Sequence, residues 1–215
     1  MTFNSLYQNY IVPGSTLLPI AAGLIGYRKL SEPLKAILLY LCFVLPINIC
    51  GIVLASHRIN NLPLLHFYTM FEFVAVMWYY KLAFKTKLSD KWTTALMIIF
   101  PVLCVVNFTF FQPLTTFNTY TRPPEAFIII IFSGIYLATQ SNYDKKEQLN
   151  NSGRWVASGF LIYFVSSLFE FIFANIVSQI PDRQIKHLIW NIHAGFVIVM
   201  YICFFLAIQH DRRKR

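Results

Sequence analysis

The sequence predicts an all-α membrane protein, a single seven-transmembrane helix bundle with its N-terminus outside and its C-terminus inside (N-out/C-in). Hydrophobic residues make up 57% of the 215 residues and charged residues only 13%, whereas soluble domains have about 45 to 50% and about 25%. Apolar runs long enough to cross a bilayer core of about 30 Å follow one another along the chain. Basic residues gather in alternate connections between these runs. The runs occupy nearly all of residues 1–215, so we expect one transmembrane domain and no soluble catalytic or signalling domain.

Seven apolar runs, each of roughly 17 to 25 residues, are expected to span the membrane. They cover residues 10–27, 34–55, 63–84, 92–111, 124–140, 155–179 and 186–208. The first run ends at Arg28 and Lys29, the reverse of the charge order in a cleaved signal peptide, so we expect it to remain. Three runs contain prolines that kink membrane helices without breaking them: Pro19, Pro46 and Pro101. Aromatic residues mark the inner boundaries of the third, fourth and sixth runs: Trp78, Tyr79, Tyr80, Trp92 and Trp155.

The basic residues predict the orientation. Four Lys and Arg residues lie on one side of the predicted bundle: Arg58, Arg122, Arg183 and Lys186. The other side has the remaining fourteen of the 18: Arg28, Lys29, Lys35, Lys81, Lys85, Lys87, Lys91, Lys145, Lys146, Arg154, Arg212, Arg213, Lys214 and Arg215. Cytoplasmic connections carry an excess of Lys and Arg, so this second side is expected to be the inside. We assign the net charge of +9 to contact with anionic lipids of the bilayer and expect no nucleic-acid partner.

Two carboxylates, Glu72 and Glu170, lie in the middle of predicted spans. A charge at that depth costs about 2.5 to 3.5 kcal/mol on insertion scales, so such residues face the interior of a bundle. No Lys or Arg is expected at the same depth, which leaves His66 and His193 as the available cationic partners. We therefore expect at least one of the two glutamates to hold a proton, alone or shared. A glutamine at position 72 should then preserve the fold, and a lysine should not.

Other polar residues gather in the outer half of the predicted bundle. Tyr68, Thr69 and Glu72 share one helix face, and a polar stripe runs along the sixth span through Tyr163, Ser166, Ser167 and Glu170. Trp190 and His193 are one turn apart in the seventh span, and Arg122 and Glu125 lie at the mouth of the fifth. The proline-rich outer connection at 112–125 is either a cap over this region or an ordinary turn. The pattern predicts a polar pocket open to the exterior.

Motifs for catalysis or metal binding are weak. His66, His193 and a glutamate have the ligand types of a zinc site, but the sequence contains no His-x-x-x-His or His-Glu-x-x-His motif. It also contains no Gly-x-Ser-x-Gly motif for a serine nucleophile. The four cysteines lie inside predicted spans without paired spacing and are expected to pack as small apolar residues. We assign no catalytic residue, metal or cofactor, and the sequence favours a protein that is not an enzyme.

Four motifs follow one another between about residues 60 and 200. They are His66-Phe-Tyr68-Thr69-x-x-Glu72-Phe73, Phe117-Asn118-x-x-x-Arg122-x-x-Glu125, Tyr163-Phe164-x-Ser166-x-x-Phe169-x-Phe171 and Trp190-x-x-His193. In this order they resemble a group of uncharacterised seven-helix integral membrane proteins of bacteroidete bacteria. The resemblance implies a multi-pass protein of the cell inner (cytoplasmic) membrane, with no assigned activity, that works beside sensor kinases.

The leading hypothesis is a receptor or sensor that binds a small molecule or lipid in the outward-facing pocket and signals through a membrane or kinase partner protein. The residues expected to bind the ligand are His66, Tyr68, Thr69, Glu72, Arg122, Glu125, Tyr163, Ser166, Glu170, Trp190 and His193. A second hypothesis is a proton-coupled small-molecule transporter in which Glu72 or Glu170 carries the proton. A third is a metal-dependent intramembrane hydrolase that uses the histidines.

Overall fold

A computed structural model of the chain describes residues 3–84, 86–141 and 151–213, and these residues form helices and short connections without a β-strand. The charged connector that the sequence places between the fifth and sixth runs lies, at 142–150, outside the described residues. The short elements at the start of the chain are α1 (Phe3–Leu6), the π-helical η1 (Tyr7–Ile11), α2 (Val12–Ser15), α3 (Leu17–Ile25) and the 3₁₀ turn η2 (Tyr27–Lys29). The long helices are α4 (Glu32–Ser56), α5 (Leu62–Phe84), α6 (Lys87–Phe110), α7 (Arg122–Ser141), α8 (Asn151–Ser178) and α9 (Arg183–Arg213).

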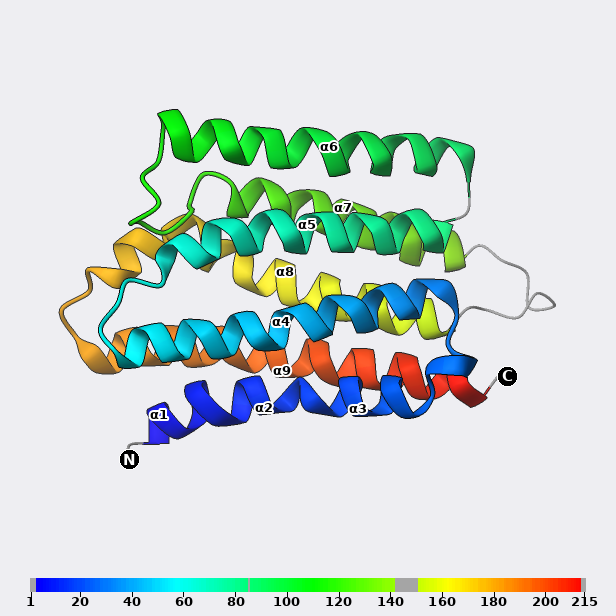
Figure 1. Ribbon diagram of the computed structural model, residues 1–215, viewed down its shortest axis with the longest axis horizontal. Helices are drawn as coiled ribbons and strands as arrows, with labels where there is room; N and C mark the ends of the chain where they lie inside the picture. The colour runs from blue at the N-terminus through cyan, green and yellow to red at the C-terminus, as the bar shows by residue number, and fades with distance from the viewer. Residues whose placement is uncertain (1–2, 85, 142–150, 214–215) are drawn as a thin grey trace.

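The helices lie side by side along one long axis, and successive long helices run along it in opposite directions (Figure 1). The N-terminus and the connections α4–α5, α6–α7 and α8–α9 lie at the left end in that view, which we call the N-terminal end. The connection from α3 to α4 and the C-terminus lie at the opposite, C-terminal end. A hydrogen bond ties this end together, because the backbone N–H of Ser31 donates to Asp211 Oδ2 of α9 at 2.7 Å.

Five helices in the described part of the chain are long and apolar enough to cross a membrane, namely α4, α6, α7, α8 and α9. They indicate a helical, multi-pass membrane protein. The third predicted span coincides with α5, which contains His66, Glu72 and Lys81 and does not meet that measure of length and composition. The first predicted span is broken into η1, α2 and α3. Helices therefore occupy all seven predicted segments, whereas the crossing of seven spans and their orientation stay predictions.

The prolines of the first segment interrupt its helical hydrogen bonds but not its helical backbone. Pro13 and Pro19 lack a backbone N–H, so neither can make the helical hydrogen bond to the carbonyl four residues earlier. α2 ends at Ser15, four residues before Pro19, and α3 begins again at Leu17. Ile11, Val12 and Thr16 at the junctions all have right-handed helical φ and ψ, so the pieces follow one another without leaving the helical conformation.

The C-terminal half of the bundle is packed with aromatic side chains. Tyr79, Tyr80, Phe160 and Phe204 are fully buried, and the rings of Phe160 and Phe204 lie 5.0 Å apart between centroids. Helices α8 and α9 approach closely at Gly159, where a Cβ atom would lie 2.9 Å from Cys203 Cβ. This dense half leaves the opposite, N-terminal half as the place for a cavity.

Candidate functional site

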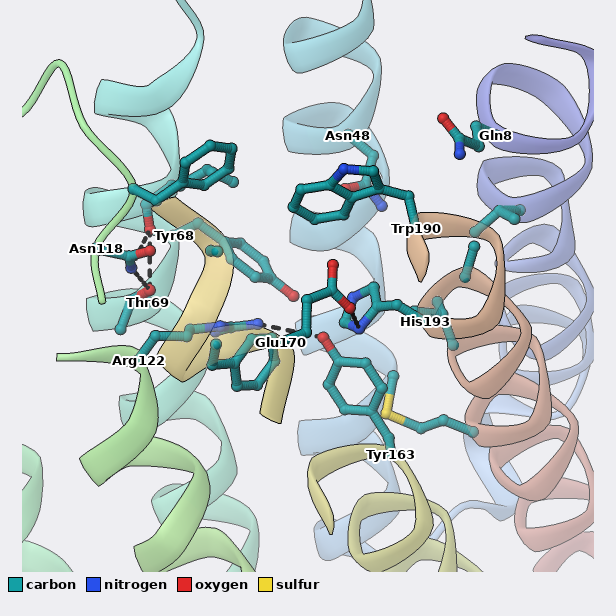
Figure 2. Close-up of a pocket in the computed structure, with 18 of the residues that line it drawn as sticks. Gln8, Asn48, Tyr68, Thr69, Asn118, Arg122, Tyr163, Glu170, Trp190 and His193 are labelled. Carbon is teal, nitrogen blue, oxygen red and sulfur yellow. Dashed lines mark hydrogen bonds and ion pairs between the residues drawn. The ribbon is translucent and has the colours of Figure 1, made fainter. Parts of the chain in front are cut away.

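A cavity of about 310 Å³ lies in the N-terminal half of the bundle. Residues of η1, α2, α4, α5, α7, α8 and α9 line it, together with the connection between α6 and α7 (Figure 2). Ligand pockets have volumes of roughly 300 to 1,000 Å³, so this cavity has room for a small ligand. It lies at the end of the bundle where the predicted pocket residues gather, and its opening to the exterior stays a prediction.

The cavity wall combines aromatic, polar and charged side chains. The aromatic residues are Tyr68, Phe117, Tyr163, Phe171, Trp190 and Tyr201. The polar residues are Gln8, Asn48, Thr69, Asn118 and Thr119, and the charged or titratable residues are Arg122, Glu170 and His193. Such a wall offers apolar contact area together with a few polar groups that fix the orientation of a ligand.

The connection between α6 and α7 folds over the cavity and is held there by side-chain amides. Gln112 Nε2 donates to the carbonyl of Phe117 at 2.8 Å, and Asn175 Oδ1 of α8 accepts from the backbone N–H of Phe117 at 3.2 Å. Asn118 donates to Thr69 of α5. The ring of Phe117 stacks on Trp190 of α9, with centroids 5.8 Å apart. Of the two structures that the sequence allows for this connection, the observed one is the cap.

Arg122 is buried beside the cavity and pairs with two carboxylates. Its Nη1 contacts Glu72 Oε2 and lies 2.8 Å from Glu125 Oε2. Both glutamates are fully buried and Arg122 is 8% exposed. The other nitrogen, Nη2, donates to Tyr163 Oη at 3.3 Å, and the guanidinium carbon lies 4.6 Å from the ring centroid of Phe171. We call Arg122, Glu72 and Glu125 the charged triad.

Glu72 has two further donors in the charged triad. Tyr40 of α4 and Tyr68 of α5 both donate their hydroxyl hydrogens to Glu72 Oε1, at 2.6 and 2.7 Å. One carboxylate therefore accepts from α4, α5 and α7, which links three helices through buried charge-assisted hydrogen bonds. This arrangement fixes where Arg122 can lie in the cavity wall.

Glu170 and His193 form a separate pair across α8 and α9. Glu170 Oε2 lies 2.8 Å from His193 Nδ1, a contact at ion-pair distance whose angles are outside those of a hydrogen bond. Figure 2 shows the carboxylate of Glu170 reaching the cavity between Trp190, His193 and Tyr163. The other oxygen, Oε1, is buried and has no hydrogen-bond partner among the described residues.

Seven of the eleven residues predicted to bind a ligand line the cavity: Tyr68, Thr69, Arg122, Tyr163, Glu170, Trp190 and His193. Glu72 and Glu125 lie behind the wall and hold Arg122. His66 is buried and donates from Nε2 to the carbonyl of Thr116 at 2.9 Å, so it anchors the cap. Ser166 is half-buried and does not line the cavity, although its neighbours Tyr163 and Glu170 do.

The expectation that only histidines are available to the two glutamates is wrong. Arg122, placed by sequence in an outer connection, turns into the bundle and pairs with Glu72. His193 pairs with Glu170 as expected, but His66 pairs with neither glutamate. Arg122 lies beside Glu72 as a cation, so the lack of such a cation no longer argues for a proton shared between Glu72 and Glu170. The expectation that glutamine at position 72 preserves the fold depended on that proton and loses its basis.

The residues of this site that are absent from the expected set include Gln8, Tyr40, Asn48 and Tyr201. Asn48 is an amide in the second apolar run and Tyr40 is a tyrosine in its middle. Polar groups at such depth are a signal for bundle-facing positions. Tyr201 and Gln8 carry no comparable signal, because an aromatic residue in a span and a polar residue near a terminus are both common.

The histidines do not gather into a metal site. Within residues 3–84, 86–141 and 151–213, no group of three or more His, Cys, Asp or Glu side chains is arranged to hold a metal ion. The hydrolase hypothesis requires His66 and His193 to bind one metal ion. In the structure, His66 donates to the cap, whereas His193 contacts Glu170. In the described residues, these two histidines therefore do not form a shared ligand set.

Comparison of the chain with models of protein families, with curated proteins and with solved structures finds no match.

Proposed function

We propose that the protein is a receptor-like protein of the bacterial inner membrane, which binds a small molecule or lipid in the cavity and passes this event to a partner protein. The proposal includes seven spans with the N-terminal end outside. It also includes membership of the bacteroidete seven-helix group that the motifs resemble, and a membrane or kinase partner.

One observation carries the proposal, namely the number of helices that meet at one cavity. A ligand there would touch side chains from η1 to α9 at once. A ligand shifts a conformational equilibrium only by its difference in affinity for the two conformations. A site shared by so many helices is suited to such a difference, because any change in helix packing alters several contacts with the ligand.

Transport is the second candidate, and the pair Glu170–His193 favours it, because a carboxylate and an imidazole at a cavity wall can carry a proton. A transporter also needs an opening on the other side. The C-terminal half contains buried aromatic rings such as Tyr80, Phe160 and Phe204. Because these rings occupy the place where a second opening would lie, we favour a receptor. Uptake of the retained molecule into proteoliposomes, driven by a proton gradient, would reverse this preference.

Native mass spectrometry of the purified full chain tests ligand binding. Ala174 is buried, lines the cavity and has a small side chain, so Ala174→Trp should fill the cavity. The matched control is Ile176→Trp, on the same helix and 63% exposed. We expect the wild type and Ile176→Trp to retain a molecule that Ala174→Trp loses. The same retained mass, or none, in all three proteins would contradict the proposal.

A further inference from the structure

We infer that the cavity selects an organic cation, a protonated amine with a small apolar body, and that Glu170 is its counter-charge. This inference rests on the proposed role of the cavity in binding a ligand. It deepens that role by naming the chemical class of the ligand.

Glu170 has the acceptor that such a ligand needs. The residue is only 5% exposed and lines the cavity. His193 engages Oε2, whereas Oε1 has no hydrogen-bond partner among the described residues. A buried carboxylate oxygen without a partner is costly. An ammonium N–H donated from the cavity would satisfy it, with the strength of a charge-assisted hydrogen bond.

Arg122, in contrast, already pairs with two carboxylates. Glu72 and Glu125 already occupy its Nη1, and Nη2 donates to Tyr163. Among the described residues, Glu170 is the only carboxylate that lines the cavity. Because Arg122 occupies Glu72 and Glu125, Glu170 is the carboxylate left to attract a cation in this poorly solvated site.

The aromatic wall adds a second element of cation recognition. Tyr163, Phe171 and Trp190 line the cavity with Glu170, and ring faces attract cations within about 6 Å. The wall already holds one cation in this way, because the guanidinium of Arg122 lies 4.6 Å from the Phe171 centroid. Trp190, stacked on Phe117 of the cap, offers the most favourable ring for a second cation.

Three probes of the same shape and different charge test the inference. They are 2-phenylethylammonium, the neutral 2-phenylethanol and the anionic 3-phenylpropanoate, titrated calorimetrically into the full chain in phosphatidylcholine nanodiscs. We expect the ammonium to bind at least about tenfold more tightly than the alcohol, and the anion to bind most weakly. Neutral lipid keeps the ammonium from concentrating at the membrane surface.

Glu170→Gln should weaken ammonium binding by about ten- to a hundredfold and leave binding of the alcohol unchanged. The matched control is Asp182→Asn, which removes one negative charge at the same end of the bundle from an exposed residue that lies outside the cavity. Asparagine preserves the helix-capping bond that Asp182 accepts from Gln184. This control should bind the ammonium like the wild type.

A second pair of variants keeps the test valid if Glu170→Gln does not fold. Trp190→Leu should weaken ammonium binding by about threefold or more, and Trp190→Phe should preserve most of it. Equal affinity for ammonium and alcohol, an unchanged affinity in Glu170→Gln, or no ammonium binding would each overturn the inference. If the alcohol or the anion binds best and Ala174→Trp abolishes that binding, the cavity remains a ligand site and only its selectivity for cations fails.

Discussion

Replacement of Arg122 by methionine should destabilise the protein strongly. The arginine holds Glu72 and Glu125, and both carboxylates are fully buried. Methionine preserves much of the apolar volume but leaves two carboxylates facing each other without a cation. The substitution therefore tests whether the charged triad holds α5 and α7 together.

The burial of the charged triad determines how far Arg122→Met should lower the free energy of unfolding. Exposed ion pairs contribute about 0 to 1 kcal/mol, but the side chains of this triad are 10%, 1% and 0% exposed. Removing one partner of a buried pair costs about 3 to 5 kcal/mol, because the remaining charge loses its compensation. We expect Arg122→Met to lower the free energy of unfolding by an amount in that range.

Unfolding by titration of a denaturing detergent into mixed micelles, followed by circular dichroism, measures this free energy. A triple variant provides the control, with Arg122→Met combined with Glu72→Gln and Glu125→Gln. Neutral groups need no counter-charge, so the triple variant should recover about 2 kcal/mol or more of the loss. An Arg122→Met protein within about 0.5 kcal/mol of the wild type, or a triple variant as unstable as the single one, would refute this reasoning.

Other predictions concern Glu72, Tyr40 and the orientation. In the same unfolding assay, Glu72→Gln should cost about 1 to 3 kcal/mol because it removes one counter-charge of Arg122. Glu72→Lys should cost more because it adds a cation beside that arginine. If both variants are as stable as the wild type, the charged triad does not stabilise the fold. Tyr40→Phe, which loses the 2.6 Å bond to Glu72, should cost about 1 to 3 kcal/mol, and Tyr10→Phe, at a 60% exposed side chain, should stay within about 0.5 kcal/mol. A cysteine placed in the 142–152 segment of a variant without the four native cysteines should resist impermeant thiol reagents in intact cells, and ready labelling there would reverse the proposed orientation.

Hydrophobic runs were sufficient to predict the helices, because the length and polarity of a run are properties of the sequence. The third predicted run, 63–84, differs from α5 by a single residue at its start. The first run differs more, because hydropathy does not register that Pro13 and Pro19 remove backbone donors. Its length satisfied the requirement for a span, but its helical hydrogen-bond pattern changes after Ser15.

The site was predicted in outline, and its internal pairing was not. Helical periodicity placed Tyr163 and Glu170 on one face, and both line the cavity. The partner of Glu72 depends on the relative height of α5 and α7 and on the reach of a long side chain, neither of which is encoded in the spacing of residues along one helix. The sequence therefore suggested that Arg122, at the start of α7, belongs to the outer connection, although it lies buried against Glu72.

Access to the cavity from outside is the central claim, and the labelling of a single cysteine tests it most directly. The variant is Ala174→Cys, at a position that lines the cavity, in a background without the four native cysteines. The probe is methanethiosulfonate ethyltrimethylammonium, a small impermeant cation added to intact spheroplasts. We expect Cys at position 174 to react from outside, and Ala194→Trp, which fills the same cavity, to slow this reaction at least about tenfold. A cysteine that stays unmodified in spheroplasts, or reacts only in inside-out vesicles, would contradict an outward-facing binding cavity.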